Sequence, residues 1–223
     1  MSAGFDVLHV DNHLLVVRKH AGIPMVADAS GDESLQEAAK LWIKHKYDKP
    51  GAVFLGVVHR LDRPVSGVVV LARTSKSASR LTNAFRERVV QKTYWAVSAR
   101  APREPRGMLE QWLIKDRTKN RVSVAMPESE GAKRAVTKYR VLGERGGRCL
   151  LELEPSTGRS HQLRVACASM GIPLLGDLKY GAAEPLEDKS IALHARRLAF
   201  EHPTLGERLE FEAETPSLGV WAF

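Results

Sequence analysis

The stretch that decides the fold is residues 57–74, which reads VVHRLDRPVSGVVVLART. Its two ends are apolar, as in buried strands, whereas its middle carries His59, Arg60, Asp62 and Arg63. Charged side chains are rarely buried unless an opposite charge pairs with them. We therefore expect two strands joined by a loop that holds Asp62 where the first strand ends.

Asp62 has two interpretations at this stage. An aspartate on a rigid loop, held ionised by arginine, is a competent nucleophile or base. A buried Asp–Arg pair could instead do no more than fix a turn. The local pattern alone favours this second, structural interpretation.

The segments around this stretch predict an α+β protein. A helix is expected after Ser34, which forms a capping-box pattern with Glu37, and a second helix is expected with Ser75 as its N-cap. Residues 158–170 have a third helical pattern. Strands outnumber helices and often follow one another directly, which favours a mixed, largely antiparallel β-sheet with flanking helices. The predicted strands are 5–10, 14–17, 53–58, 67–72, 92–99, 136–142, 149–153, 193–200 and 208–213.

Composition and charge suggest a globular protein with a polyanionic partner. The chain has 223 residues, 43% of them hydrophobic, and a net charge of +8. A domain this basic favours RNA or DNA as a partner, although many basic proteins bind neither. Cys149 and Cys167 are too few for a disulfide framework and are expected to be reduced and buried. With no signal-peptide pattern and no long apolar run, we expect a cytoplasmic protein without membrane contact.

Several common chemistries lack their motifs. There is no phosphate-binding G-x-x-x-x-G-K-[ST] or G-x-G-x-x-G, and the histidines are too scattered to suggest a metal site. A hydrolase that uses Ser66 with His59 and Asp62 is an alternative, but the G-x-S-x-G elbow of such enzymes is missing.

Two further blocks carry polar or aromatic groups. In STGRSHQLR, residues 156–164, Gly158 permits a tight turn and Ser160 can cap the next helix. Four side chains there could donate to phosphate or carboxylate groups at the helix N-terminus, although a solvated first turn is the commoner explanation. They are Arg159, His161, Gln162 and Arg164. In QKTYWAV, residues 91–97, Tyr94 is either an ordinary half-buried strand tyrosine or a face on which an unpaired base stacks.

Together the blocks resemble one family. HRLDRPVSGVVVLART, QKTYWAV, STGRSHQLR with GIPLLGDLKYG, and LHARRLAFEHP follow in that order, and VLHVDNHLLVVRKHAGIP precedes them. This order resembles the pseudouridine synthases of the ribosomal large-subunit synthase A (RluA) type, from about Phe5 to the end of the chain. The resemblance implies a mixed β-sheet with a central catalytic cleft.

The resemblance also implies the reaction and its residues. It implies isomerisation of specific uridines in structured rRNA or tRNA to pseudouridine, with no cofactor and no metal. Asp62 matches the catalytic aspartate, Tyr94 the tyrosine that stacks on the target uracil and can take part in proton transfer, and Arg164 the arginine that pairs with the aspartate. Four residues are expected to bind substrate: His59, Arg60, Arg159 and His161. A non-catalytic RNA-binding protein on the same scaffold is the alternative.

The chain departs from the family pattern at two letters. Val65 stands where the family often has threonine, and His20 stands where it usually has proline. We also expect a single catalytic domain over 1–223, without the S4-type RNA-binding domain of many relatives, acting as a monomer. RNA affinity would then come from its own basic surface. Candidate patches, each of which is individually more typical of a solvated face, are 115–121, 133–134, 100–106, and Arg86 with Arg88.

Overall fold

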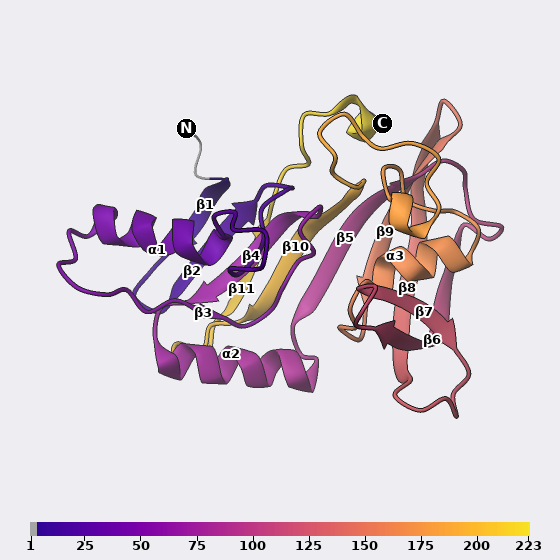
Figure 1. The fold of residues 1–223 in the computed structure, drawn as a ribbon. Helices are drawn as coiled ribbons and strands as arrows, with labels where there is room; N and C mark the ends of the chain where they lie inside the picture. Colours follow the sequence, from indigo (N-terminus) through magenta and orange to yellow (C-terminus); the bar gives the residue numbers. More distant parts are fainter. Residues whose placement is uncertain (1–3) are drawn as a thin grey trace. The chain divides into compact units, whose positions relative to one another are not determined.

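A computed structural model describes residues 4–223 of the chain, which divide into two compact units (Figure 1). Unit 1 comprises the chain up to Gln91 together with Ala195–Thr215. Unit 2 comprises Lys92–His194 and Pro216–Phe223. Each unit is described by itself below.

Unit 1 is a sheet with two helices. Its strands neighbour one another in the order β1, β2, β4, β10, with β3 beside β4 and β11 beside β10. The helices are α1 (Leu35–Lys46) and α2 (Ser75–Glu87). The strands are β1 (Phe5–Val10), β2 (Leu14–Lys19), β3 (Gly56–Val57), β4 (Ser66–Ala72), β10 (Leu193–Glu201, entering unit 1 at Ala195) and β11 (Arg208–Glu212).

Helix α2 covers one face of this sheet. Its Leu81 is fully buried in a core cluster with Leu14 of β2, Val70 of β4 and Phe200 of β10. All seven residues of β4 are buried, as expected for a central strand. Residues 66–72 are therefore the rigid centre of unit 1, and the Asp62 loop leads directly into them.

Of the three predicted helix caps, the structure confirms Ser34 alone. Ser34 and Glu37 form the complete capping box at α1. The cap of α2 is Thr74, whose side chain accepts from Ser77 N–H, so the prediction of Ser75 was wrong by one residue. Ser160 does not cap the third helix either, because α3 begins after His161, whose backbone is left-handed.

Unit 2 is an antiparallel sheet with one helix. Its strands pair in the order β5, β9, β8, β6, β7, and each pair is antiparallel. Helix α3 packs on this sheet through Val165, which joins a core cluster with Leu113, Val122 and Tyr180. The elements are β5 (Gln91–Ser98), β6 (Arg106–Asp116), β7 (Arg121–Ala125), β8 (Lys133–Arg145), β9 (Arg148–Pro155) and α3 (Gln162–Ser169).

The α+β class with a mixed, mainly antiparallel sheet is thus confirmed, although the bounds of several elements differ and the predicted strands do not include β6 and β7. The predicted strand 53–58 shrinks to the two residues of β3, and the predicted helix 158–170 starts later, at Gln162. Cys149 and Cys167 are free and buried, as expected. Burial raises the pKa of the Cys149 thiol to about 11 and that of Cys167 to about 12, so both are chemically inert near neutral pH.

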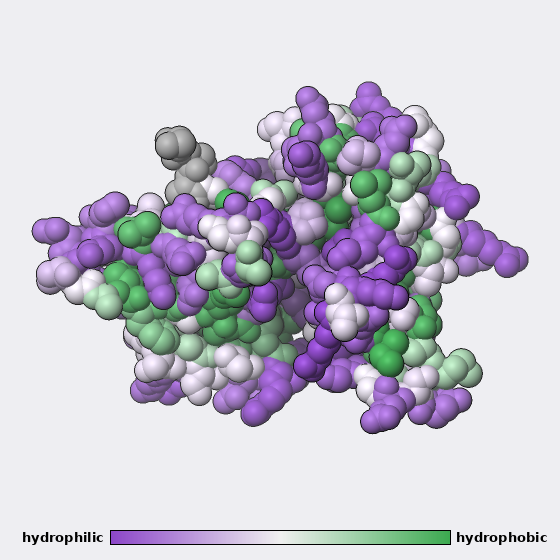
Figure 2. Space-filling model, viewed as in Figure 1, coloured by the Kyte–Doolittle hydropathy of each residue, from purple (hydrophilic) through white to green (hydrophobic). Residues whose placement is uncertain are grey.

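The surface of the protein is mainly hydrophilic, with some exposed apolar side chains (Figure 2). Figure 2 shows hydrophilic side chains over most of the face in view, with apolar side chains reaching the surface of unit 1 between α1 and α2. Leu41 and Phe54 are about half exposed, at 50% and 52%. No helix in residues 4–223 is long and apolar enough to span a membrane.

Gly67 is required where β4 meets β10. Its φ is +121°, and a Cβ at this position would lie 2.3 Å from the carbonyl oxygen of Ala195. The two backbones therefore approach closely only because residue 67 has no side chain. This explains the Ser-Gly pair at the start of the buried strand.

We predict that Gly67→Ala destabilises the protein by roughly 2–4 kcal/mol. The added methyl group would push against the backbone of Ala195, and alanine is strained at this positive φ. Gly206→Ala is the matched control, because Gly206 also has a positive φ (+76°) but no atom within 4 Å of its Cβ position. It should cost about 1 kcal/mol. Urea unfolding measures both values. Equal losses for the two variants would contradict the close-approach explanation.

Candidate active site

The Asp62 loop is a turn anchored on both sides by buried apolar residues. The amide of Val65 donates to the carbonyl of Asp62 at 3.0 Å, closing a turn over residues 62–65. Leu61 and Val65 are buried, at 6% and 2% exposure, whereas Asp62 itself is partly exposed. The apolar flanks thus fix the loop and leave its carboxylate accessible. Val65, the departure from the family pattern, fills one of these buried positions.

Lys19 holds this turn from within the protein. Its side chain is fully buried at the end of β2. Its Nζ donates to the carbonyl of Arg63 at 3.1 Å and to that of Val65 at 2.9 Å. A third donor reaches the carbonyl of His20 at 2.9 Å. The three bonds use all three N–H groups of an ammonium, whereas a neutral amine has only two.

Burial lowers the pKa of Lys19 to about 7, and the negative charge of Asp62 acts in the opposite direction. A buried ammonium is costly unless its donors are satisfied. Here they are satisfied by carbonyls of the segment that bears Asp62 and by that of His20. The sequence interpretation missed Lys19, although the lysine lies in the quoted block VLHVDNHLLVVRKHAGIP.

The local pattern suggested that an arginine beside Asp62 forms a buried ion pair with it, but the structure places both neighbouring arginines differently. Arg63 is directed at the segment after β2: its Nε donates to the Gly22 carbonyl at 2.8 Å, and its guanidinium also pairs with Asp32. Arg60 is exposed. A buried Asp–Arg pair within residues 60–63 is therefore not what shapes the turn; the Lys19 ammonium and the Arg63 side chain are.

His59 supports the sheet. The amide of Val70 in β4 donates to His59 Nε2 at 3.0 Å, at a point where the two-residue strand β3 has already ended. The imidazole also stacks on Phe85 of α2, with ring centroids 4.5 Å apart. Nε2 of His59 is therefore occupied by a backbone amide and Ser66 is only 5% exposed, which does not favour the hydrolase alternative.

Tyr94 lies in the middle of β5, opposite Leu153 of β9. Leu153 is fully buried and Tyr94 is partly exposed. Two residues earlier, Lys92 Nζ lies 3.4 Å from the carbonyl of Thr157, at the start of the loop that leads to α3. Tyr94 is therefore fixed by the strand at its backbone and has part of its side chain at the surface.

Gln162 does not serve as a donor to an external anion, which corrects the expectation from the sequence. Its amide nitrogen donates to the Val136 carbonyl and to Thr137 Oγ1, both at 3.0 Å. Its amide oxygen accepts from Thr157 Oγ1 at 2.7 Å and from the Arg159 amide at 3.0 Å. The side chain is buried and ties the loop before α3 to β8.

Arg164 forms a buried ion pair within unit 2. Its Nε and one terminal nitrogen each donate to the Asp177 carboxylate at 2.7 Å. The two side chains are 7% and 1% exposed, and the guanidinium lies over the Tyr180 ring, 5.0 Å from its centroid. These bonds fix the plane of the guanidinium and use two of its five N–H donors. The sequence interpretation gave Asp177 no role, although it belongs to the quoted GIPLLGDLKYG block.

His161 and Arg159 are also held by neighbours in unit 2. The Tyr180 hydroxyl accepts from the Val122 amide at 2.9 Å and forms a 2.7 Å hydrogen bond with His161 Nδ1. Burial raises the pKa of Tyr180, so this hydroxyl stays protonated. Arg159 Nε donates to the Arg134 carbonyl at 3.0 Å. Both side chains remain partly exposed.

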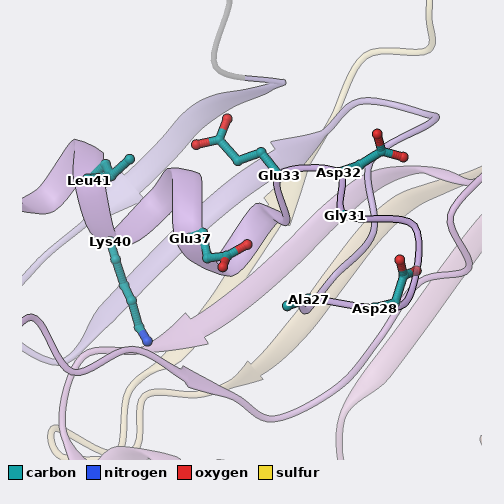
Figure 3. A pocket seen from close by; sticks show the side chains of 8 residues that line it. All are labelled: Ala27, Asp28, Gly31, Asp32, Glu33, Glu37, Lys40 and Leu41. Carbon is teal, nitrogen blue, oxygen red and sulfur yellow. The ribbon is translucent and has the colours of Figure 1, made fainter.

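An acidic pocket lies elsewhere in unit 1, between the segment after β2 and helix α1 (Figure 3). Two of its carboxylates already serve the fold, since Asp32 pairs with Arg63 and Glu37 accepts from Ser34. Within residues 4–223, no group of three or more His, Cys, Asp or Glu side chains is arranged to hold a metal ion. The pocket is lined by Ala27, Asp28, Gly31, Asp32, Glu33, Glu37, Lys40 and Leu41.

Known proteins similar to this chain share one description. The sequence model of the family described as RNA pseudouridylate synthase matches residues 13–169. An uncharacterized RNA pseudouridine synthase of Zymomonas mobilis is 35% identical over 194 residues, covering 86% of this chain and 85% of the relative. Ribosomal large subunit pseudouridine synthase D of the same organism is 34% identical over 222 residues, covering 95% of this chain and 69% of the relative.

A solved structure agrees with these matches. The structure of human RNA pseudouridylate synthase domain containing 4 superposes with a TM-score of 0.79 at 28% identity. The match covers 95% of this chain and 88% of the human chain. The similarity therefore extends over both units.

We predict that Asp177→Asn costs about 3–5 kcal/mol of unfolding free energy, because it removes the buried negative charge that Arg164 binds through two hydrogen bonds. Glu110→Gln is the matched control: Glu110 also binds an arginine, Arg134, through two 2.7 Å bonds, but at the surface. That exposed pair should contribute little. Denaturant unfolding of both variants decides the point, and a loss for Glu110→Gln as large as that for Asp177→Asn would refute it.

Proposed function

We propose the role of Asp62 from the premise that this chain belongs to the RluA type of RNA pseudouridine synthases, which isomerise uridine in RNA. In this proposal, Asp62 is the carboxylate on which the isomerisation depends. The observation that carries this proposal is the support given to the Asp62 turn. Lys19 donates to the carbonyls of Arg63 and Val65, which follow Asp62 in the turn, while Asp62 itself stays partly exposed. A rigid backbone under an accessible acid is what a catalytic group requires.

The reaction requires this carboxylate to be ionised. The glycosidic C–N bond breaks, the uracil rotates, and a C–C bond forms through C5, which loses its proton. A carboxylate can serve by attacking the sugar, by attacking the base or by assisting elimination. Each route requires the anion, and a nearby guanidinium favours that form. We assign this role to Arg164, whose plane is already fixed by Asp177.

The other site residues are proposed as contacts with RNA. Tyr94 would stack on the extruded uracil, which returns roughly 1–3 kcal/mol of the unstacking cost. Its position on a paired strand and its partial exposure support this role. We propose that His59, Arg60, Arg159 and His161 bind substrate. All four retain some exposed surface, and Arg60 is the most open of them.

We further propose that both units form one catalytic domain that modifies ribosomal RNA or transfer RNA. The family match runs from residue 13 to residue 169, through parts of both units, which supports a single functional domain. Ribosomal large-subunit synthases among the relatives support an rRNA target. The two free, buried cysteines fit a cytoplasmic enzyme. As the family resemblance implies, the enzyme would act as a monomer without a metal or cofactor.

We predict that Asp62→Asn abolishes pseudouridine formation while RNA affinity stays within about threefold of wild type, because the amide lacks the charge and nucleophilicity of the carboxylate. Tritium release from RNA labelled at uridine C5 measures the reaction, with rRNA and tRNA transcripts as parallel substrates. Asp48→Asn is the control, since Asp48 is exposed in unit 1 and asparagine tolerates its left-handed backbone. Near wild-type release by Asp62→Asn would refute the assignment.

Tyr94→Phe separates stacking from proton transfer. The ring is retained, so RNA affinity should not change, whereas the loss of the hydroxyl should lower the single-turnover rate by about 10²-fold if it moves a proton. Tyr47→Phe, at an exposed tyrosine of unit 1, is the control. A wild-type rate for Tyr94→Phe would limit Tyr94 to stacking.

A further inference from the structure

His20 stands next to the lysine that supports the Asp62 turn. It occupies the position where the family pattern has proline, whose ring fixes φ without any partner. The carbonyl of His20 accepts one of the three hydrogen bonds from Lys19 Nζ, at 2.9 Å. The place of this carbonyl therefore helps to decide where the ammonium sits.

His20 is held at both its backbone and its side chain. Its amide, which a proline would lack, donates to the carbonyl of Gly4 at 3.0 Å. Its Nε2 lies 2.7 Å from Asp6 Oδ2, across the β1–β2 hairpin. The same carboxylate oxygen accepts from Arg18 Nε at 2.7 Å, so Asp6 is itself fixed.

The negative charge on Asp6 strengthens this hydrogen bond, which lies at the surface, with the His20 and Asp6 side chains 37% and 45% exposed. The hydrogen bond from His20 and the guanidinium of Arg18 hold the pKa of the Asp6 carboxyl below its usual range. An anionic acceptor strengthens a hydrogen bond from either the neutral or the protonated imidazole. The Asp6 carboxylate can only accept here, so Nε2 of His20 is the donor.

We propose that His20, tethered to Asp6, is a positioning residue for the Asp62 turn. The inference rests on the proposed role of Asp62. The connection runs from Asp6 to the His20 side chain, from the His20 carbonyl to Lys19, and from Lys19 to the carbonyls of Arg63 and Val65.

A loss of the tether would act on the turn by a small displacement. With the imidazole removed, the backbone at His20 keeps the bond to Gly4 but loses its lateral restraint, and its carbonyl can turn away from Lys19. The ammonium then has two acceptors in place of three and shifts between them. A misplacement of a catalytic group by about 1 Å can cost up to about 10²-fold in rate.

The test compares His20→Ala, His20→Gln and Asp6→Ala with wild type by tritium release under single-turnover and steady-state conditions. His20→Ala should lower kcat by about tenfold with KM within about twofold of wild type. His20→Gln should recover most of kcat, because its side-chain amide can still donate to Asp6. His45→Ala, at an exposed histidine of α1, should behave as wild type.

Asp6→Ala should lower kcat as much as His20→Ala, and the double variant should be no slower than either, since both changes break the same link. All variants are compared well below their unfolding midpoints, so a fall in kcat reports position and not unfolding. A wild-type kcat for His20→Ala, a change confined to KM, or no recovery with His20→Gln would overturn the proposal.

Asp62→Asn in the same assay distinguishes this inference from the function on which it rests. An inactive Asp62→Asn with a fully active His20→Ala rejects only the role of His20. An active Asp62→Asn rejects the role of Asp62 and, with it, any positioning of Asp62 by His20.

Discussion

A single buried ammonium organises the part of unit 1 that carries Asp62. Lys19 Nζ is fully enclosed and donates to three backbone carbonyls, two of them in the turn that bears the carboxylate. Burying an ammonium costs several kcal/mol unless every donor is satisfied. The turn is therefore restricted to conformations in which the carbonyls of Arg63 and Val65 point at Lys19. Asp62, which directly precedes Arg63 in this turn, is positioned as a consequence.

Unit 2 uses a second buried cation in a different way. Arg164 is satisfied by the two oxygens of Asp177, which fix the plane of the guanidinium, and Tyr180 covers its face. The Tyr180 hydroxyl then orients His161. Lysine offers a point charge that collects carbonyls, whereas arginine offers a planar fork that matches a carboxylate. Each unit thus supports its proposed catalytic side chain through a buried, oppositely matched partner: Lys19 binds the Asp62 turn, and Asp177 binds Arg164.

Several residues of the motif blocks have roles in the fold that the pattern did not suggest. His59 accepts a hydrogen bond from the Val70 amide of β4, and Gln162 joins the loop before α3 to β8. Arg63 pairs with Asp32 and not with the neighbouring aspartate. Within one contiguous motif block, some residues stabilise the fold and others are proposed to take part in the reaction. The order of the blocks identifies the family without separating these two groups.

The sequence by itself determined the elements whose signals are local: the capping box at Ser34, the β1–β2 hairpin, the buried run of β4 and the three helices. It also determined the family, through the order of its motif blocks, and the α+β class. Only the tertiary structure decided the partners of Lys19 and Arg164, which lie as far as 46 and 13 residues away along the chain. The physical reason is that Lys19 binds backbone carbonyls. Every residue carries one, so no letter in the sequence marks the three that the fold brings to the ammonium.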